Sequence, residues 1–402
     1  MYCVFNVIIA SVPSLIAVCF GRFVTGFASA TPATVAFGSF EDMYMSETRI
    51  WIVYVYTLIG NTGLVLGPIY SEYVTTYAGW RWVFYISSIV SGLGILASCF
   101  LHESRTGYLL ECKIKAIQKQ TSHQYLRSLR CPEKKNFTVW RFVQDSLFRP
   151  LRFLVTEPIV ICCAVLMAVS FSLIYGLTVG LTVVYTNFGF LESTTSSLSF
   201  IPLLIGLLIN VLPRIYDQRI FTRYRQEHRP LRPETKVGSL VTACPALAIG
   251  LWLFAWTVPP RIQHVHWSVS MIGLVLVGYA TNDLSYILFG YLTDSYGSNA
   301  ASACSALSLA RTLMAAAFPL FTHTIYTHLG ANISTSIFAA VATIFCITPV
   351  IFIKYGRRLR RSSHFALGDE SEEKEDHESA IGEGGEIKSN EGNGQQPRFS
   401  LE

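Results

Sequence analysis

The chain has 402 residues, of which 51% are hydrophobic and only 14% are charged, and its formal net charge is +5. Soluble domains carry about 25% charged residues, so this composition excludes an ordinary soluble protein. Apolar runs of about 20 residues recur along the chain, the length that a helix needs to cross a bilayer. The sequence therefore predicts an all-α, multi-pass membrane protein. Its basic residues lie in loops between apolar runs, so we expect no nucleic-acid partner.

The first apolar piece, from Tyr2 to Ser11, ends shortly before Pro13. About ten residues of helix rise only ~15 Å, half of a ~30 Å hydrocarbon core, so we expect the chain to begin in mid-span. Nine full spans are then predicted, at 14–38, 50–72, 82–102, 157–180, 194–212, 236–258, 267–289, 299–323 and 333–354.

The polar segments divide the chain and orient it. Basic residues cluster in 103–152, in 213–236 and after the last span, all on one side if every run crosses once, and this side is predicted to be cytoplasmic. We expect four parts: an incomplete N-terminal helix bundle (1–102), a cytoplasmic loop with an amphipathic helix (103–152), a C-terminal six-helix bundle (153–356) and a disordered cytoplasmic tail (357–402).

The second full span contains Gly60, Gly63 and Gly67, followed by Pro68. Spacings of three and four place the three glycines on one helical face, where another membrane helix can approach closely. Pro68 removes a backbone donor and bends the helix. This pattern indicates a helix that seals one side of a cavity, or equally a small-residue seam of a kind found in many membrane proteins.

Three charged residues lie inside predicted spans. Arg22, four residues before Gly26, needs a cavity, an acid or a route to the membrane surface, because a bare guanidinium in hydrocarbon is costly. We expect it to face an open groove with no carboxylate of this chain in contact. Asp283 lines a polar cavity or lies near the interface. Arg311 lies in the following span, about 9 Å from the depth of Asp283, which argues against direct contact.

Other polar and aromatic residues are weaker candidates. Tyr175 and Tyr286 lie deep enough to stack on a hydrophobic or cationic solute, although ordinary packing explains each equally well. Acids at the cytoplasmic helix ends either form ion pairs that latch one conformation or simply cap helices; they are Asp42, Glu103, Glu157 and Asp294. Ten cysteines without paired spacing, and His264 and His266 without a third ligand, predict neither a metal site nor a cofactor.

Several of these segments resemble the major facilitator superfamily, in its drug:proton antiporter branch of fungal multidrug and polyamine-type transporters. The stretch Gly60–Pro68 resembles that branch's fifth-span motif, except that Ser71-Glu72 replaces its glycine pair. The Arg22-x-x-x-Gly26 pattern resembles the fourth span, and Gly79-Trp-Arg-Trp82 resembles the start of the sixth. Matching pieces follow in order over about 360 residues, as far as Tyr355-Gly356.

This resemblance implies a major facilitator fold that lacks its first two spans, with half of span 3 followed by spans 4 to 12. It also implies that Arg22 takes part in proton coupling and that two helix bundles alternate access to a central site. An arginine that matches Arg311 recurs in this family. We therefore expect proton-coupled export of drugs or organic cations by a monomer in the lipid bilayer, at the plasma membrane or the vacuole. The alternative is a membrane fragment or sensor that does not transport; no motif indicates an enzyme or an ATP-driven pump.

Overall fold

The computed structural model describes residues 1–44, 46–100, 112–113, 148–187, 197–226, 237–258 and 266–361. These ranges are helical and contain no strand. Eight of their helices are long and apolar enough to cross a membrane. The prediction of an all-α, multi-pass membrane protein is therefore confirmed. Most of the loop 103–152, where an amphipathic helix is predicted, lies outside the described residues, as does the tail after 361.

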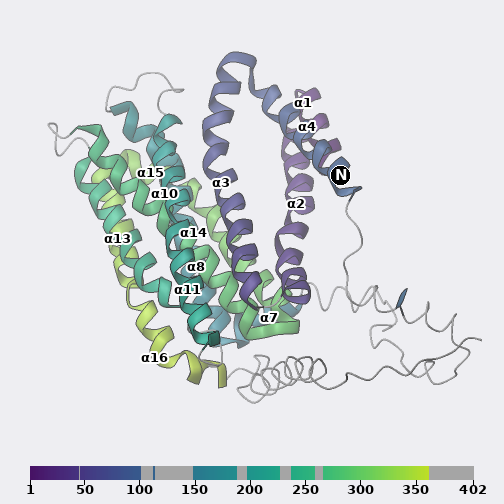
Figure 1. The fold of residues 1–402 in the computed structure, drawn as a ribbon. Helices are drawn as coiled ribbons and strands as arrows, with labels where there is room; N and C mark the ends of the chain where they lie inside the picture. Colours follow the sequence, from purple (N-terminus) through teal and green to yellow (C-terminus); the bar gives the residue numbers. More distant parts are fainter. Residues whose placement is uncertain are drawn as a thin grey trace, which may run out of the picture.

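The N-terminal half consists of α1 (Tyr2–Ser11), α2 (Leu15–Met43), α3 (Ser46–Ala78) and α4 (Trp80–Ser98). Helix α1 packs against α2 and α4, and buries Ile9 and Ala10 beside Phe84 in a small core of its own. The Ser88 hydroxyl of α4 donates a hydrogen bond to the Cys3 carbonyl of α1 at 3.0 Å. In Figure 1 these helices stand to one side of the C-terminal helices.

The C-terminal half contains the main apolar core. Its helices are α7 (Arg149–Thr156), α8 (Pro158–Asn187), α10 (Ile201–Ile209), α11 (Val211–Gln226), α13 (Leu240–Thr257), α14 (Trp267–Tyr296), α15 (Ala300–Phe345) and α16 (Thr348–Arg361). Helix α14 is central: it packs against α8, α10, α13 and α15, and against α2 and α3 of the other half. It is buried on almost every face, as its apolar and small residues require.

Three predicted boundaries differ from the structure. The polar segment that was expected to begin at 213 is helical to Gln226, because α11 follows α10 with only Asn210 between them. Helix α15 contains one predicted span and the first part of the next, separated by Gly330, where φ is 79° and the helix breaks; the rest of the second span lies in α16. Helix α16 continues to Arg361, past the residue at which a disordered tail was expected.

Close approach of helix backbones occurs in the C-terminal half, not at the glycine stripe of α3. A Cβ atom added to Gly206 of α10 would lie 2.0 Å from the carbonyl oxygen of Val275, and one added to Gly278 of α14 would lie 2.2 Å from that of Leu203. No side chain larger than hydrogen fits between these helices without moving them. The contact therefore sets how closely α10 and α14 approach.

The expected packing of Gly60, Gly63 and Gly67 is not found: an added Cβ at any of them has no described neighbour within 4 Å. The buried face of α3 is instead formed by Val53, Tyr54, Thr57, Asn61 and Val65. At 100° per residue, the glycine stripe points about 110° away from this face. Among the described residues, the glycine face of α3 therefore makes no close helix contact.

Replacing Gly206 with Ala should lower the thermal unfolding midpoint of the detergent-solubilised protein, because overpacking typically costs about 1–3 kcal/mol. Gly63→Ala is the matched control, and it should be neutral or slightly stabilising since Ala favours a helix by about 1 kcal/mol over Gly. Equal midpoints for the two variants would show that α10 and α14 adjust freely at this contact.

Candidate functional site

The two halves meet at the end of the molecule that the charge pattern predicts to be cytoplasmic. There Arg49 of α3 forms an ion pair with Asp294 of α14 at 2.8 Å. The rings of Phe37 and Phe289 stack with centroids 4.3 Å apart and planes within 8°. The lower ends of α2 and α3 reach the C-terminal helices at this end in Figure 1. The described structure is thus closed between the halves on this side.

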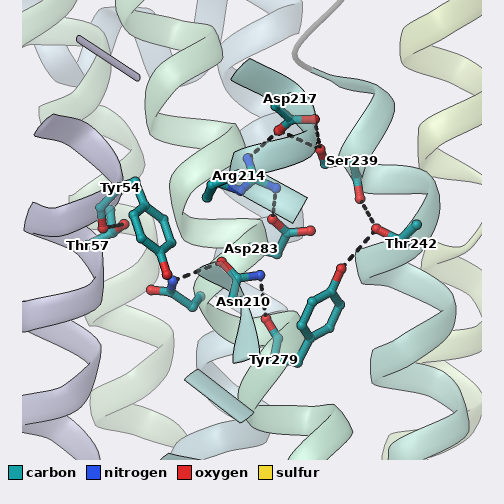
Figure 2. Close-up of polar contacts among 10 residues, drawn as sticks. Tyr54, Thr57, Asn210, Arg214, Asp217, Ser239, Thr242, Tyr279 and Asp283 are labelled. Carbon is teal, nitrogen blue, oxygen red and sulfur yellow. Dashed lines mark hydrogen bonds and ion pairs between the residues drawn. The ribbon is translucent and has the colours of Figure 1, made fainter. Parts of the chain in front are cut away.

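A buried ion pair lies deeper, inside the C-terminal half. Arg214 of α11 and Asp283 of α14 are both fully buried, and the guanidinium Nη2 contacts Asp283 Oδ1. Nη1 of Arg214 lies 2.8 Å from Oδ2 of Asp217, one turn further along α11. Figure 2 shows the guanidinium between the two carboxylates. With one cation and two anions, the cluster has a formal charge of −1, and one added proton would make it neutral.

The charged cluster is held in place from two sides. The Ser239 hydroxyl donates to both oxygens of Asp217 at 2.9 and 3.1 Å, so the start of α13 fixes this carboxylate. The face of the Arg214 guanidinium lies 4.1 Å from the ring centroid of Tyr286, on the same helix as Asp283. This stacking holds the plane of the guanidinium while its edge meets the acids.

Amide side chains connect this cluster to the N-terminal half. Asn282, the neighbour of Asp283, donates to Asn210 Oδ1 at 3.0 Å. Asn61 of α3 donates to Asn282 Oδ1 at 3.1 Å and lies 3.3 Å from the Ser285 hydroxyl. All these amides are buried, where a lost hydrogen bond costs about 1–3 kcal/mol. Movement of α14 at Asp283 would therefore change its contact with α3.

Arg311 of α15 forms a second, separate polar site. Its guanidinium lies 4.5 Å from the ring centroid of Phe171 and 5.8 Å from that of Phe289. Tyr56 and Tyr175 are the ionisable groups that influence it electrostatically. Unlike Arg214, it forms no ion pair with any residue that the structure describes.

Comparison with known proteins assigns the chain. The family model described as Major Facilitator Superfamily matches residues 1–319. The chain belongs to this superfamily. The solved structure of the major facilitator proton:xylose symporter XylE, bound to 6-bromo-6-deoxy-D-glucose, superposes with a TM-score of 0.54 at 16% identity, covering 88% of this chain and 78% of XylE. At this identity the likeness supports the fold alone.

Fungal transporters are similar in sequence. The efflux pump FUBT of Fusarium oxysporum is 28% identical over 86% of this chain and 58% of its own length. The efflux pump radE of Floropilus chiversii is 30% identical over 86% of this chain and 64% of its own length. The multidrug transporter TPO1_2 of Candida glabrata is 28% identical over 91% of this chain and 63% of its own length. The chain thus spans about three fifths of the length of these relatives.

The major facilitator assignment and the eight long apolar helices make the protein an integral, multi-pass membrane protein. The predicted site residues lie in different parts of it. Arg22 is exposed and lies 4.7 Å from the ring centroid of Phe84, with no ion pair among the described residues. Gly26 is exposed as well. Both residues lie on α2, whereas the buried ion pair joins α11 and α14.

The four acids predicted to latch the cytoplasmic helix ends differ in the contacts that they form. Asp294 does form an ion pair, with Arg49. Glu157 is buried and accepts a hydrogen bond from the Tyr296 hydroxyl at 2.9 Å, so it joins α7 and α14 within one half. The side chain of Asp42 and the whole of Glu103 lie outside the described residues. Tyr175 is half-buried, and the ring of Tyr286 stacks on Arg214.

The predicted distance of Asp283 from the cytoplasmic end of its helix was too short, because α14 continues to Tyr296. Asp283 lies about 20 Å from this end. Asp283 and Arg311 therefore lie at similar depths, but Asp283 pairs with Arg214. Arg214 was missed because it follows Pro213 and was counted with the cytoplasmic basic residues. Its apolar neighbours Leu212 and Ile215, and an acid three residues later, are the signals that indicate a buried partner.

Arg214→Met should destabilise the detergent-solubilised protein by about 3–5 kcal/mol, because it leaves buried carboxylates without a counter-charge. Adding Asp283→Asn to this variant should recover much of the loss, since the remaining acid, Asp217, keeps its Ser239 partner. Thermal unfolding midpoints test this, with Arg22→Met as the control for loss of an exposed arginine. A double variant as unstable as the sum of the single variants would contradict the pairing.

Proposed function

We propose that this protein exports small organic molecules in exchange for protons by alternating access. The observation that carries the proposal is the Arg214–Asp283 pair, whose neighbouring Asn282 is hydrogen-bonded to Asn61 of the other half. The similarity to efflux pumps and multidrug transporters supports the direction of transport.

In the proposed cycle, Asp283 is the carboxylate that takes up the proton. While it is ionised, it holds Arg214 and keeps α14 against α11. When it is protonated, Arg214 retains only Asp217 as an ionised partner, and the attraction between the two helices weakens. The charged and phenolic groups that interact electrostatically with Asp283 include Arg214, Asp217, Tyr279 and, from the other half, Tyr54.

The interface contacts of the predicted cytoplasmic end would then act as the gate. For the opposite side to be exposed, the Arg49–Asp294 pair and the Phe37–Phe289 stack must separate. Trp51 of α3, which donates to Gln218 of α11 at 2.9 Å, must also be released. We place 103–152 and the tail on the cytoplasmic side, between and after the two bundles, and propose a monomer in the plasma membrane.

Asp283→Asn should abolish transport driven by a pH gradient while leaving passive exchange of substrate. The purified protein is reconstituted in liposomes, and uptake of ethidium and of fluorescein is followed with and without the gradient. Glu72→Gln, which removes an acid of α3 outside the cluster, is the control and should behave as wild type. Gradient-driven uptake by Asp283→Asn would refute the role of Asp283 in coupling. If wild type shows no gradient-driven uptake, the result would favour a protein that does not transport.

Reversing the charge of Arg49 should open the predicted cytoplasmic end. Ala301 contacts Gly38 across the two halves at this end, so Ala301→Cys, in a background without native cysteines, reports its exposure. Arg49→Asp should speed labelling of this cysteine by an impermeant maleimide in inside-out vesicles. The charge swap Arg49→Asp with Asp294→Arg should restore slow labelling. If the swap labels as fast as the single variant, the ion pair does not hold the gate.

A further inference from the structure

Arg311 lies at the centre of its membrane span. The span runs from Ala300 to Thr322, so eleven residues separate Arg311 from each end. At 1.5 Å per residue, this distance is about 16 Å along the helix. An arginine side chain is too short to reach either membrane surface from this depth, so snorkelling does not account for it.

Aromatic rings from both halves surround this guanidinium. Phe171 of α8 and Phe289 of α14 lie nearest, and both are buried. Phe37 of α2 stacks on Phe289, and Tyr56 of α3 meets Phe37 edge-on at a centroid distance of 5.2 Å. Five helices, α2, α3, α8, α14 and α15, therefore converge here. A site between the halves is where alternating access requires the substrate to bind.

The guanidinium has no anionic partner in the described part of the chain. No ion pair or hydrogen bond involves Arg311 there, and its Nε atom is buried with its donor unused. The buried acids of the described spans have other partners: Asp283 pairs with Arg214, and Glu157 accepts from Tyr296. Arg311 is half-buried in the middle of a membrane span, where a guanidinium without a counter-charge is costly, and a bound anion would reduce that cost.

We propose that Arg311 and the rings around it bind an organic anion, a flat apolar molecule that carries a carboxylate or a phenolate. A guanidinium that stacks on aromatic faces keeps its edge donors for a planar, bidentate acceptor. Phe171 and Phe289 would pack against the apolar body of the same molecule. A cationic substrate would be repelled by Arg311 and would find no described acid to bind it. The inference rests on the proposed export function and replaces the organic cations expected from the sequence.

Three probes with one ring system and different charges test this site in the purified full chain. They are naphthoate, its neutral amide, and naphthylmethylammonium, and binding is followed by the quenching of tryptophan fluorescence. Wild type should bind naphthoate at least about tenfold more tightly than either of the other two, a ratio that corresponds to 1.4 kcal/mol. Preference for the cation or the amide, or failure of naphthoate to bind, would overturn the proposal.

Substitutions assign the preference to Arg311. Arg311→Gln should remove the tenfold advantage of naphthoate and leave binding of the amide unchanged, whereas Arg311→Lys should retain part of it. Arg81→Gln removes the same charge from an exposed arginine 5.7 Å from Trp80 and should keep the full advantage. An unchanged preference in Arg311→Gln would overturn the assignment even if wild type favours the anion. The charge preference is measured on the wild-type protein, so the proposal can still be tested if one variant misfolds.

Transport separates this inference from the proposed function. In liposomes with a pH gradient, the anion fluorescein should be moved and the cation ethidium should not. Gradient-driven ethidium uptake without fluorescein uptake would overturn the anion site but leave proton-coupled export intact. Naphthoate binding that depends on Arg311, without any gradient-driven uptake, would support the site and refute proton-coupled export.

Discussion

The interaction on which the rest of the structure depends is the burial of Arg214 between two carboxylates. Removing an ion from water costs several kcal/mol even after the protein relaxes, and the cost is recovered only where the counter-charges are well placed. Here Asp283, Asp217 and the ring of Tyr286 occupy three sides of one guanidinium. These partners come from α11 and α14, so the two helices cannot separate without breaking a buried ion pair.

The packing of α10 and α11 on α14 places these groups in register. Gly206, Asn210 and Arg214 are spaced by four residues, and Gly278, Asn282 and Tyr286 repeat the same spacing on the partner helix. Residues four apart share a helical face, so the glycines meet first, the amides one turn later and the cation and ring after that. Each level is observed: a close backbone approach, a 3.0 Å hydrogen bond and a 4.1 Å cation–π contact. The close approach of the glycines is what allows the shorter amide side chains to meet.

Sequence patterns predicted the membrane class, most of the spans and the family, because these depend on hydropathy and on local motifs. They also identified Asp283 and Arg311 as charges inside spans. They did not identify Arg214, because a basic residue after a proline is typical of a span end, and only the fold shows that α11 continues inside the protein. The glycine stripe of α3 was assigned to a close contact because spacing defines a face but not the neighbour that it meets. Pairings between distant helices, such as Asn61 with Asn282, leave no local signal at all.

The three polar sites share one rigid element. Asp283, Phe289 and Asp294 lie on α14 within twelve residues, about 17 Å of helix, and serve the buried ion pair, the Arg311 site and the gate respectively. A proton on Asp283 makes the first site neutral, and a bound organic anion makes the Arg311 site neutral. In an exchanger the two ligands are carried in opposite half-cycles, so each transition takes place with one of the two sites neutral: the Arg311 site when the organic anion is carried, and the Asp283 site when the proton is carried. Because α14 contributes to both sites, either ligand changes the energy of the same moving helix, and this shared element would couple proton uptake to substrate movement.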